Sequence, residues 1–352
     1  MPKETMTPKE RWMAVLKRQK PDRLPVDYWA TEEVTKMMLK HYGLSSDREM
    51  FKKLHIDRPV DVGGKYIGPA IPKDHDVFGI KYRSVDYGSG SYIEGASAPL
   101  SAFETVEEIE KNYKWPSSDW YDYSNVPSQL KGYEDYPVAG GYCEPFLLYK
   151  QLRGEEQAFI DLAINPEICN YILDKLYGLA FENIKRIYEA IPGKVTYSYI
   201  AEDVGGQEDL MYSPEHIRQY FLPRMKKVID YVHQAGAYSF HHTDGAVRKI
   251  IPDLIKTGHD ILNPIQWRCK GMEREGLAKD FGDKLIFHSA VDNQKTIPFG
   301  TPEDVKKEVA ENVKIFGRGY IIGPCHNLQP VTPVANIVAL YEAAHEQAFN
   351  IK

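Results

Sequence analysis

The chain has 352 residues, of which 43% are hydrophobic and 27% are charged, and its formal net charge is −6. This composition is ordinary for a globular protein with a core, and the acidic balance argues against partners such as nucleic acid or an anionic membrane surface. The absence of an apolar run of roughly 18–20 residues, of a signal-like N-terminus and of a disulfide framework among four cysteines predicts a reduced, cytoplasmic protein.

The predicted elements begin with a helix that opens at Thr7, the N-cap, with Pro8 in the first turn and Glu10 completing a capping box. Pro21 ends this helix, and residues 24–29 (LPVDYW) then predict a short strand. Residues 63–128 are rich in Gly, Ser, Pro and Tyr, most of all in the segment 87–92 (YGSGSY). We expect a strand pair with long loops there, which forms either a cap over the site or a surface excursion.

From residue 137 onward, short apolar segments alternate with amphipathic helical stretches. Strands are expected at 137–142, 194–200, 237–242, 260–265, 284–288 and 319–322. Helices are expected at 155–189 (two helices), 214–234, 246–257, 271–281, 301–316 and 332–349, with Ser213 and Thr301 as N-caps. This alternation predicts βαβ units and a parallel sheet.

About eight strands can be counted, and no Gly-rich phosphate-binding turn follows the first of them. A doubly wound sheet usually carries such a turn. The pattern therefore favours a (β/α)₈ TIM barrel over a doubly wound sheet. We expect a single domain over residues 1–352, with an N-terminal helical extension and a loop-rich insertion.

Active sites of such barrels lie at the C-terminal ends of the strands. A lone polar residue there is most often a loop group or a helix cap, but here nearly every expected strand delivers one, and the whole ring predicts a catalytic site. The residues in the last part of the expected strands, or directly after them, are Asp27, Cys143, Glu144, Glu202, Asp203, Gln207, His242, Asp244, Asn263, Gln266, Asp292, Asn293, Gln294, Cys325, His326 and Asn327.

The segment His242-Thr243-Asp244 is the sharpest local feature. Residues two apart on an extended segment point the same way, so the imidazole and the carboxylate converge. That pair suits zinc or general acid–base catalysis, and Cys325 would supply a third metal ligand. The alternative is structural: Asp244 would cap the following helix and His242 would hydrogen-bond in the core.

Glu202 and Asp203 form an adjacent acidic pair after a Tyr-rich strand. Adjacent residues face opposite ways, so one of the two is expected to point into the barrel mouth. A carboxylate in that position would act as a general base, a metal ligand or a partner for a cationic ligand group. Helix capping or a salt bridge is the structural alternative.

Several motifs in chain order resemble the uroporphyrinogen decarboxylase superfamily, and the resemblance spans nearly the whole chain. It implies a (β/α)₈ barrel. The motifs are Met6–Arg11, Lys20–Val26, Glu202-Asp203 followed by Gly205-Gly206-Gln207, Ser213-Pro214, His242–Gly245, Leu262–Gln266, Phe299–Val305 and Gly323–Asn327.

The superfamily holds cofactor-free decarboxylases of tetrapyrrole acetate groups and methyltransferases of corrinoid-dependent systems. The decarboxylases carry an early Arg-Gln-Ala-Gly-Arg-Tyr segment whose arginines bind the substrate carboxylates. The corresponding residues here are 28–33 (YWATEE), which lack it. The resemblance therefore favours the methyltransferase branch, and metal-free decarboxylation remains the alternative. A non-enzymatic binding barrel is a further alternative.

The zinc methyltransferases of the superfamily use a His-x-Cys pair and a later Cys. The resemblance implies that His242 and Cys325 match the first and last ligands, while Asp244 stands where a Cys is usual. Fewer thiolates make zinc a harder Lewis acid, which suits an oxygen atom such as that of an ether. We therefore expect a methoxy compound as the methyl donor.

The resulting hypothesis is an O-demethylase component that transfers a methyl group to a corrinoid (cobalamin) bound by a partner protein, with a homodimer expected from the superfamily. Zinc would be held by His242, Asp244 and Cys325 and would activate the substrate oxygen. Glu202, Asp203 and Glu144 would act in catalysis. The residues expected to bind the substrate are Trp29, Tyr142, Tyr199, Asn263, Gln266 and Asn293.

Overall fold

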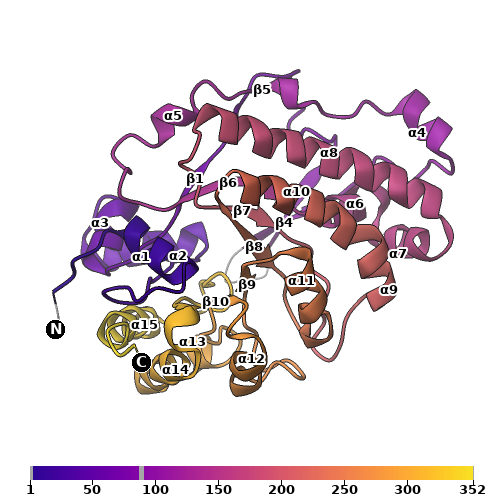
Figure 1. Ribbon diagram of the computed structural model, residues 1–352. Helices are drawn as coiled ribbons and strands as arrows, with labels where there is room; N and C mark the ends of the chain where they lie inside the picture. Colours follow the sequence, from indigo (N-terminus) through magenta and orange to yellow (C-terminus); the bar gives the residue numbers. More distant parts are fainter. Residues whose placement is uncertain (1–2, 87–90, 352) are drawn as a thin grey trace.

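The computed structural model describes residues 3–86 and 91–351, and at its centre lies a seven-stranded parallel sheet. Each strand from β6 onward pairs with the next one along the chain, and helices separate them, as βαβ units require. Figure 1 shows the strands in the middle, with α8 and α10 above them and α12, α14 and α15 below. In sheet order the strands are β1 (Val60–Val62), β6 (Val138–Cys143), β7 (Tyr197–Ile200), β8 (Tyr238–His242), β9 (Ile261–Asn263), β10 (Ile286–His288) and β11 (Tyr320–Ile321).

The predicted strand over residues 24–29 is wrong, because only an isolated bridge between Val26 and Ile322 forms there. Pro25 has no N–H to donate, which keeps the ladder short. The segment still lies between the two edges of the sheet: the N–H of Asp27 donates to the Ile322 carbonyl (2.7 Å), and the N–H of Asp57 donates to the Val26 carbonyl (2.6 Å). The fold is thus TIM-barrel-like, but its regular strands do not close.

Fifteen α-helices lie in the described residues, and most of them cover the outside of the curled sheet. Their bounds are α1 (Pro8–Leu16), α2 (Glu32–Tyr42), α3 (Asp47–Lys53), α4 (Val106–Asn112), α5 (Val126–Gln129), α6 (Pro145–Arg153), α7 (Glu155–Ile164), α8 (Pro166–Ala190), α9 (Pro214–His216), α10 (Leu222–Gln234), α11 (Ile251–Thr257), α12 (Arg274–Phe281), α13 (Thr296–Phe299), α14 (Pro302–Phe316) and α15 (Val334–Gln347). None of these combines the length and apolar character needed to cross a membrane.

The predicted N-caps at Thr7, Ser213 and Thr301 are confirmed, and Thr7 and Thr301 form full capping boxes. The single helix predicted over 214–234 is instead interrupted by a π-helical turn at Ile217–Phe221. Pro223 explains the interruption, because a proline ring clashes with the carbonyl four residues earlier and removes one hydrogen bond. The two helices α7 and α8 occupy the predicted range 155–189.

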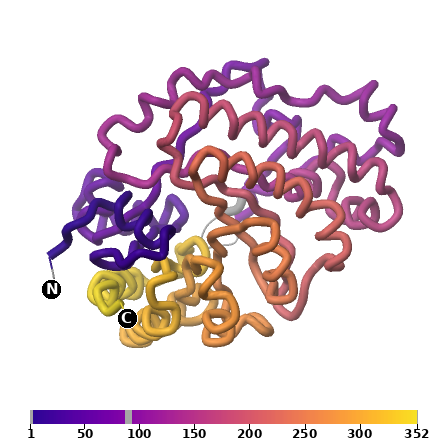
Figure 2. The backbone as a smooth tube through the Cα atoms, viewed as in Figure 1, coloured from indigo at the N-terminus to yellow at the C-terminus, as the bar shows by residue number. Residues whose placement is uncertain are grey.

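The insertion consists of two small antiparallel pairs and connecting loops. One pair joins β2 (Lys65–Tyr66) to β5 (Tyr121–Asp122), and the other joins β3 (Tyr82–Asp86) to β4 (Ser91–Gly95). A strand pair was predicted, and the second pair is an addition; residues 87–90 of the predicted loop lie outside the described residues. Figure 2 shows the trace from α4 to α5 following the outer side of α8, which both helices contact.

An aromatic plug fills the end of the barrel opposite the strands' C-terminal ends. Trp12 on α1 is fully buried and stacks on Tyr197 of β7, with ring centroids 5.6 Å apart. Its indole N–H donates to the carbonyl of Asp57 (3.0 Å). A large aromatic ring with one satisfied polar atom thus seals this end.

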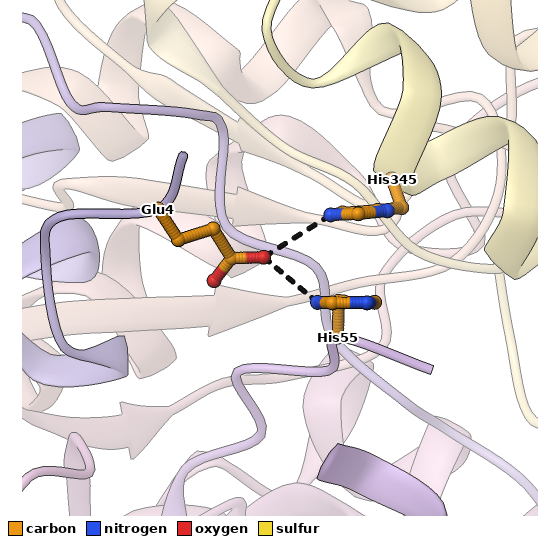
Figure 3. Close-up of side chains that lie close together, drawn as sticks. All are labelled: Glu4, His55 and His345. Carbon is orange, nitrogen blue, oxygen red and sulfur yellow. Dashed lines mark hydrogen bonds and ion pairs between the residues drawn. The ribbon is translucent and has the colours of Figure 1, made fainter. Parts of the chain in front are cut away.

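A charged cluster joins the N-terminal segment to α15 (Figure 3). Oε1 of Glu4 lies 2.7 Å from Nδ1 of His55 and 3.1 Å from Nε2 of His345. The two imidazole rings are parallel within 4° and 3.6 Å apart. Nitrogen lone pairs lie in the ring planes, and parallel planes never meet, so one metal ion cannot bind both nitrogens as they stand. Arg11 and Arg23 also contact Glu4, which further disfavours a cation.

Because of this cluster, we expect the stability of the protein to decrease as the pH is lowered. Burial raises the pKa of Glu4, but the hydrogen bond and charge of Arg23, with Arg11 and His55, lower it to about 2. Burial, together with His55 and Arg23, lowers the pKa of His345. Both pKa values are lower in the folded protein than in the unfolded chain. As the pH falls, the unfolded chain therefore binds more protons than the folded protein, and the free energy of unfolding decreases. The contribution of His345 is lost below its ordinary pKa, and that of Glu4 between 4.5 and about 2.

Urea unfolding at neutral and at successively lower pH measures this effect. The variant Glu4→Gln, which cannot titrate at this position, is expected to be less stable at neutral pH and to lose less stability on acidification than the wild type. An unchanged pH dependence in this variant would show that the cluster does not contribute.

Candidate active site

The site lies at the C-terminal ends of the strands, as predicted. His242 is the last residue of β8, Asp203 follows β7, Glu144 follows β6, and His326 follows β11. Glu144 and His242 are buried, whereas Asp203 and His326 are about one-third exposed. Parallel strands bring their C-terminal ends to one rim, so residues far apart in the sequence face a common space.

Three potential metal ligands lie together at this rim: His242, Asp244 and His326, with one ligand atom from each within 4.8 Å of the others. Nε2 of His326 lies 3.8 Å from Oδ2 of Asp244. The rings of the two histidines are inclined by 57°, so their in-plane lone pairs can converge on one ion. In this respect the group differs from the stacked pair at Glu4, and it fits a metal.

Cys325, predicted as the third ligand, is adjacent in sequence to His326 but is not part of this group. Its thiol is buried, and burial together with the charge of Asp244 raises the pKa of Cys325 well above its usual range. A buried thiol is a poor source of thiolate. His326 occupies the place expected for Cys325, and a ligand role for Cys325 stays a prediction.

Asp244 is held by its neighbours on both sides. Its backbone N–H donates to Oδ1 of Asp203 (2.9 Å), and its Oδ1 accepts from Nε2 of Gln266 (2.9 Å). Oε1 of Gln266 accepts the N–H of Gly245 (2.6 Å), where φ is +89° and a Cβ would lie about 2.5 Å from the Gly206 carbonyl. Gln266, predicted to bind substrate, thus orients Asp244, and Asp244 caps no helix.

A buried chain of hydrogen bonds leads away from His242 across the barrel. Nδ1 of His242 lies 2.7 Å from Oδ1 of Asn263, and Nδ2 of Asn263 lies 2.7 Å from Nδ1 of His288. Nε2 of His288 then lies 2.9 Å from Oδ2 of Asp27. Asn263, His288 and Asp27 are at most 1% exposed. Asn263, predicted as a substrate contact, is therefore an interior link of this chain.

The direction of these bonds fixes the proton on His242. Asp27 accepts hydrogen bonds from the N–H of Tyr28 and the indole N–H of Trp29, and the His288 bond lowers the pKa of Asp27 despite its complete burial. An ionised carboxylate needs a donor, so His288 presents Nε2–H to it and accepts at Nδ1. Asn263 must then donate to His288 and accept from Nδ1–H of His242. This leaves the Nε2 lone pair of His242 free, and that atom is 3.9 Å from Asp203.

Two aromatic rings flank His242. Trp29 and Tyr199 each lie 5.8 Å from its ring centroid, with interplanar angles of 17° and 26°. Tyr142 stacks on Tyr199 (4.7 Å). Of the three predicted aromatic substrate contacts, Trp29 and Tyr199 therefore lie beside His242, and Tyr142 contacts Tyr199.

These three rings also line a cavity of about 640 Å³, the aromatic chamber, which extends between β1, β6 and α8. The cluster residues themselves are not among its lining residues, so the chamber adjoins the cluster through the shared rings. A cavity of this size with few polar groups suits a small organic ligand. Its aromatic lining residues are Trp29, Phe78, Tyr121, Tyr123, Tyr142, Tyr197 and Tyr199.

The remaining predicted residues divide between the site and the scaffold. Glu144 accepts a hydrogen bond from the hydroxyl of Tyr142; burial raises its pKa, with Asp203 adding to the shift. Asn293 follows β10, lies outside the chamber lining, and has a buried side-chain oxygen without a hydrogen-bond partner in the described residues. Of the acidic pair, Asp203 is the member that faces the mouth.

Glu202 is bound to the helices outside the sheet. Its carboxylate accepts the N–H of Phe146 at the start of α6 (3.0 Å) and the hydroxyl of Tyr177 on α8 (2.9 Å). It is 1% exposed, and burial raises its pKa well above the usual range. We therefore expect Glu202→Ala to lower the free energy of unfolding by about 1–3 kcal/mol, because two buried donors lose their acceptor.

Denaturant unfolding and metal titration distinguish this structural role of Glu202 from a catalytic role. Glu202→Ala is expected to retain wild-type metal affinity, whereas Asp203→Ala, which removes the acceptor for Asp244, is expected to weaken it. If Glu202→Ala retained full stability and lost metal, the scaffold role would be wrong.

Sequence reasoning missed the parts played by His288, Asp27 and His326. Asp27 and His326 were recognised as strand-end residues without a role, and His288, the last residue of β10, was counted only as part of its strand. The available signal was alternation: His288 is two residues after Ile286 and shares its side of β10. A histidine among inward-facing positions indicates a buried partner.

Comparisons with known proteins agree with this architecture. Residues 86–347 match the family model described as uroporphyrinogen decarboxylase (URO-D). The chain is 24% identical over 220 residues to a curated uroporphyrinogen decarboxylase of Anaeromyxobacter sp. (strain Fw109-5), a match that covers 60% of this chain and 59% of that protein. A solved structure, a methyltransferase from Methanosarcina mazei, superimposes with a TM-score of 0.69 at 19% identity and covers 97% of this chain and 99% of its own. At this identity the likeness shows the fold alone.

Proposed function

The chain belongs to the uroporphyrinogen decarboxylase (URO-D) family, and from this premise we propose that it is a methyltransferase that moves a methyl group between a small methoxy compound and a corrinoid protein. The observation that carries the proposal is the cluster of His242, Asp244 and His326 at the C-terminal rim of the barrel. Such rims hold the active sites of barrel enzymes.

We propose zinc as the metal of this cluster. Two imidazoles and one carboxylate match the ligand types of catalytic zinc sites, which leave a further position open for substrate. A ligand set without thiolate makes the ion a harder Lewis acid and favours an oxygen donor over a thiol. The free Nε2 of His242 supports this assignment, because a metal binds the unprotonated nitrogen.

When bound, zinc supplies the Lewis acid that polarises the ether oxygen, and the corrinoid of a partner protein supplies the nucleophile that accepts the methyl group. The chain's own residues bind and orient the donor: Trp29 and Tyr199 flank both the chamber and His242.

Glu144 is the proposed proton donor. Loss of the methyl group leaves both electrons of the oxygen–carbon bond on the oxygen, which then takes up a proton. Burial and the charge of Asp203 raise the pKa of Glu144, so its carboxyl group tends to hold a proton. Tyr142 donates its hydroxyl proton to Oε2 of Glu144 and so fixes the orientation of this carboxyl group.

The test is methyl transfer from 2-methoxyphenol to cob(I)alamin by the zinc-loaded protein, followed by the absorbance of methylcobalamin. We expect zinc-dependent methylation that Asp244→Ala abolishes. Absence of methylation with every methyl ether tried, or equal rates in Asp244→Ala, would overturn the proposal. Metal-independent release of carbon dioxide from a carboxylated substrate would favour the decarboxylase alternative.

A further inference from the structure

Seven aromatic side chains line the aromatic chamber. Tyr142 and Tyr199 form a stacked pair on one side, with Phe78, Tyr121 and Tyr123 contributed by the insertion. Gly64 lies against Tyr121 and Tyr123, where a Cβ would approach their atoms to 2.9 Å. Such walls accept the faces of an aromatic ring.

Among the residues that the structure describes, three charged side chains line the chamber: Asp27, Arg58 and Asp61. Asp27 is engaged by His288 and Trp29 in the interior. Arg58 donates through Nη1 to the carbonyl of Tyr28, and its Nη2 is 3.7 Å from Oδ2 of Asp61. The guanidinium is therefore already engaged, and carboxylates outnumber it by two to one.

Asp61 is the charged group best placed to meet a ligand. Its side chain is 77% accessible, yet the protein packed around the cavity, with the charge of Asp27, raises the pKa of Asp61. A high accessibility and a raised pKa are compatible if the Asp61 carboxylate faces the inside of the chamber. Solvent reaches it there, and protein still surrounds the cavity. Within the described residues, the only charged partner of this carboxylate is Arg58, at 3.7 Å, and no closer donor bonds to it.

We propose that Asp61 sets the specificity of the chamber for uncharged methoxyarenes that carry a hydrogen-bond donor, such as a phenolic hydroxyl, against methoxyarenes that carry a carboxylate. A hydroxyl donates to the Asp61 carboxylate, whereas a substrate carboxylate meets Asp61 and Asp27 with like charge in a partly dry cavity. That the ligand carries a methoxy group rests on the proposed function. The preference for uncharged over carboxylated ligands rests on the lining residues alone.

Equilibrium binding by calorimetry, with neither zinc nor corrinoid present, tests the proposal. We expect 3-methoxyphenol to bind the wild type at least about tenfold more tightly than 3-methoxybenzoate, a factor that corresponds to roughly 1.4 kcal/mol. Asp61→Asn removes one charge and leaves Arg58 in place, so the preference is expected to narrow or reverse. Asp61→Glu keeps the charge and is expected to retain it.

Asp135→Asn, an exposed carboxylate outside the chamber, is the matched control and should bind like the wild type. Equal affinities for the two ligands in the wild type, no binding of either, or an unchanged ratio in Asp61→Asn would each overturn the proposal. A ratio that changes as expected without any methyl transfer to cob(I)alamin would uphold the charge preference and reject the proposed function.

Discussion

Alanine in place of His326 is expected to release the zinc that we propose for the cluster, whereas alanine in place of Cys325 is expected to leave it bound. The imidazole of His326 lies within reach of Asp244 and is one-third exposed, so its loss removes a ligand with little effect on packing. The affinity should fall by more than the roughly 10–100-fold that loss of an outer-shell partner costs. Metal content after dialysis and competition with a chelator measure both variants.

Cys325→Ala also tests the ligand set expected from the family pattern. Its buried thiol is exchanged for a small apolar side chain, so a modest loss of stability is expected without loss of metal. Loss of zinc in Cys325→Ala and its retention in His326→Ala would show that the thiol, and not the neighbouring imidazole, is the third ligand.

Replacing Asn263 with leucine is expected to cost both metal affinity and stability. The amide is the link between His242 and His288, and both imidazole nitrogens lose their partner when it is removed. We expect a loss of about 1–3 kcal/mol in the free energy of unfolding and about 10–100-fold in zinc affinity, because the tautomer of His242 is no longer fixed. Unfolding in urea and zinc titration measure the two effects.

Asn336→Leu is the matched control for this variant. Asn336 is 2% exposed, and its amide donates to the carbonyls of Ile297 and Gly300 (both 2.8 Å), away from the cluster. It should lose stability and keep its zinc affinity. The ¹⁵N shifts of the His242 ring provide a readout that packing alone would not change, and an unaltered Nδ1–H tautomer in Asn263→Leu would refute the role of the hydrogen-bond chain.

Much of the fold follows from local sequence rules, because capping residues and apolar alternation act over a few neighbours. Thr7 and Thr301 begin their helices as predicted, and the strands β7 to β11 lie within their expected ranges. β6 extends one residue past its expected range, to Cys143, and β1 (Val60–Val62) was not predicted. The segment 24–29 did not form the predicted strand. Its pairing depends on residues far away in the sequence, Asp57 on one side and Ile322 on the other. The π-helical turn before Pro223 was not predicted, because the apolar pattern of residues 214–234 is strongly helical and the clash of the proline ring was not taken into account.

The site was predictable where one strand determined it and not where several strands met. The two-residue spacing of His242 and Asp244 brought both into the cluster, and alternation required that only one of Glu202 and Asp203 face the mouth. The choice of His326 over its neighbour Cys325 depends on the backbone path after β11. Asn263, Gln266 and His288 owe their roles to contacts between strands, which no single segment encodes.

The hydrogen-bond chain from Asp27 to His242 joins residues that lie far apart in the sequence. Asp27 belongs to the first segment of the barrel, His288 ends β10, and His326, a ligand in our proposal, follows β11. A nascent chain on the ribosome therefore cannot assemble the cluster until residue 326 has been synthesised. The zinc that we propose would therefore bind only after this point, and truncated products ending before residue 326 are expected to lack it.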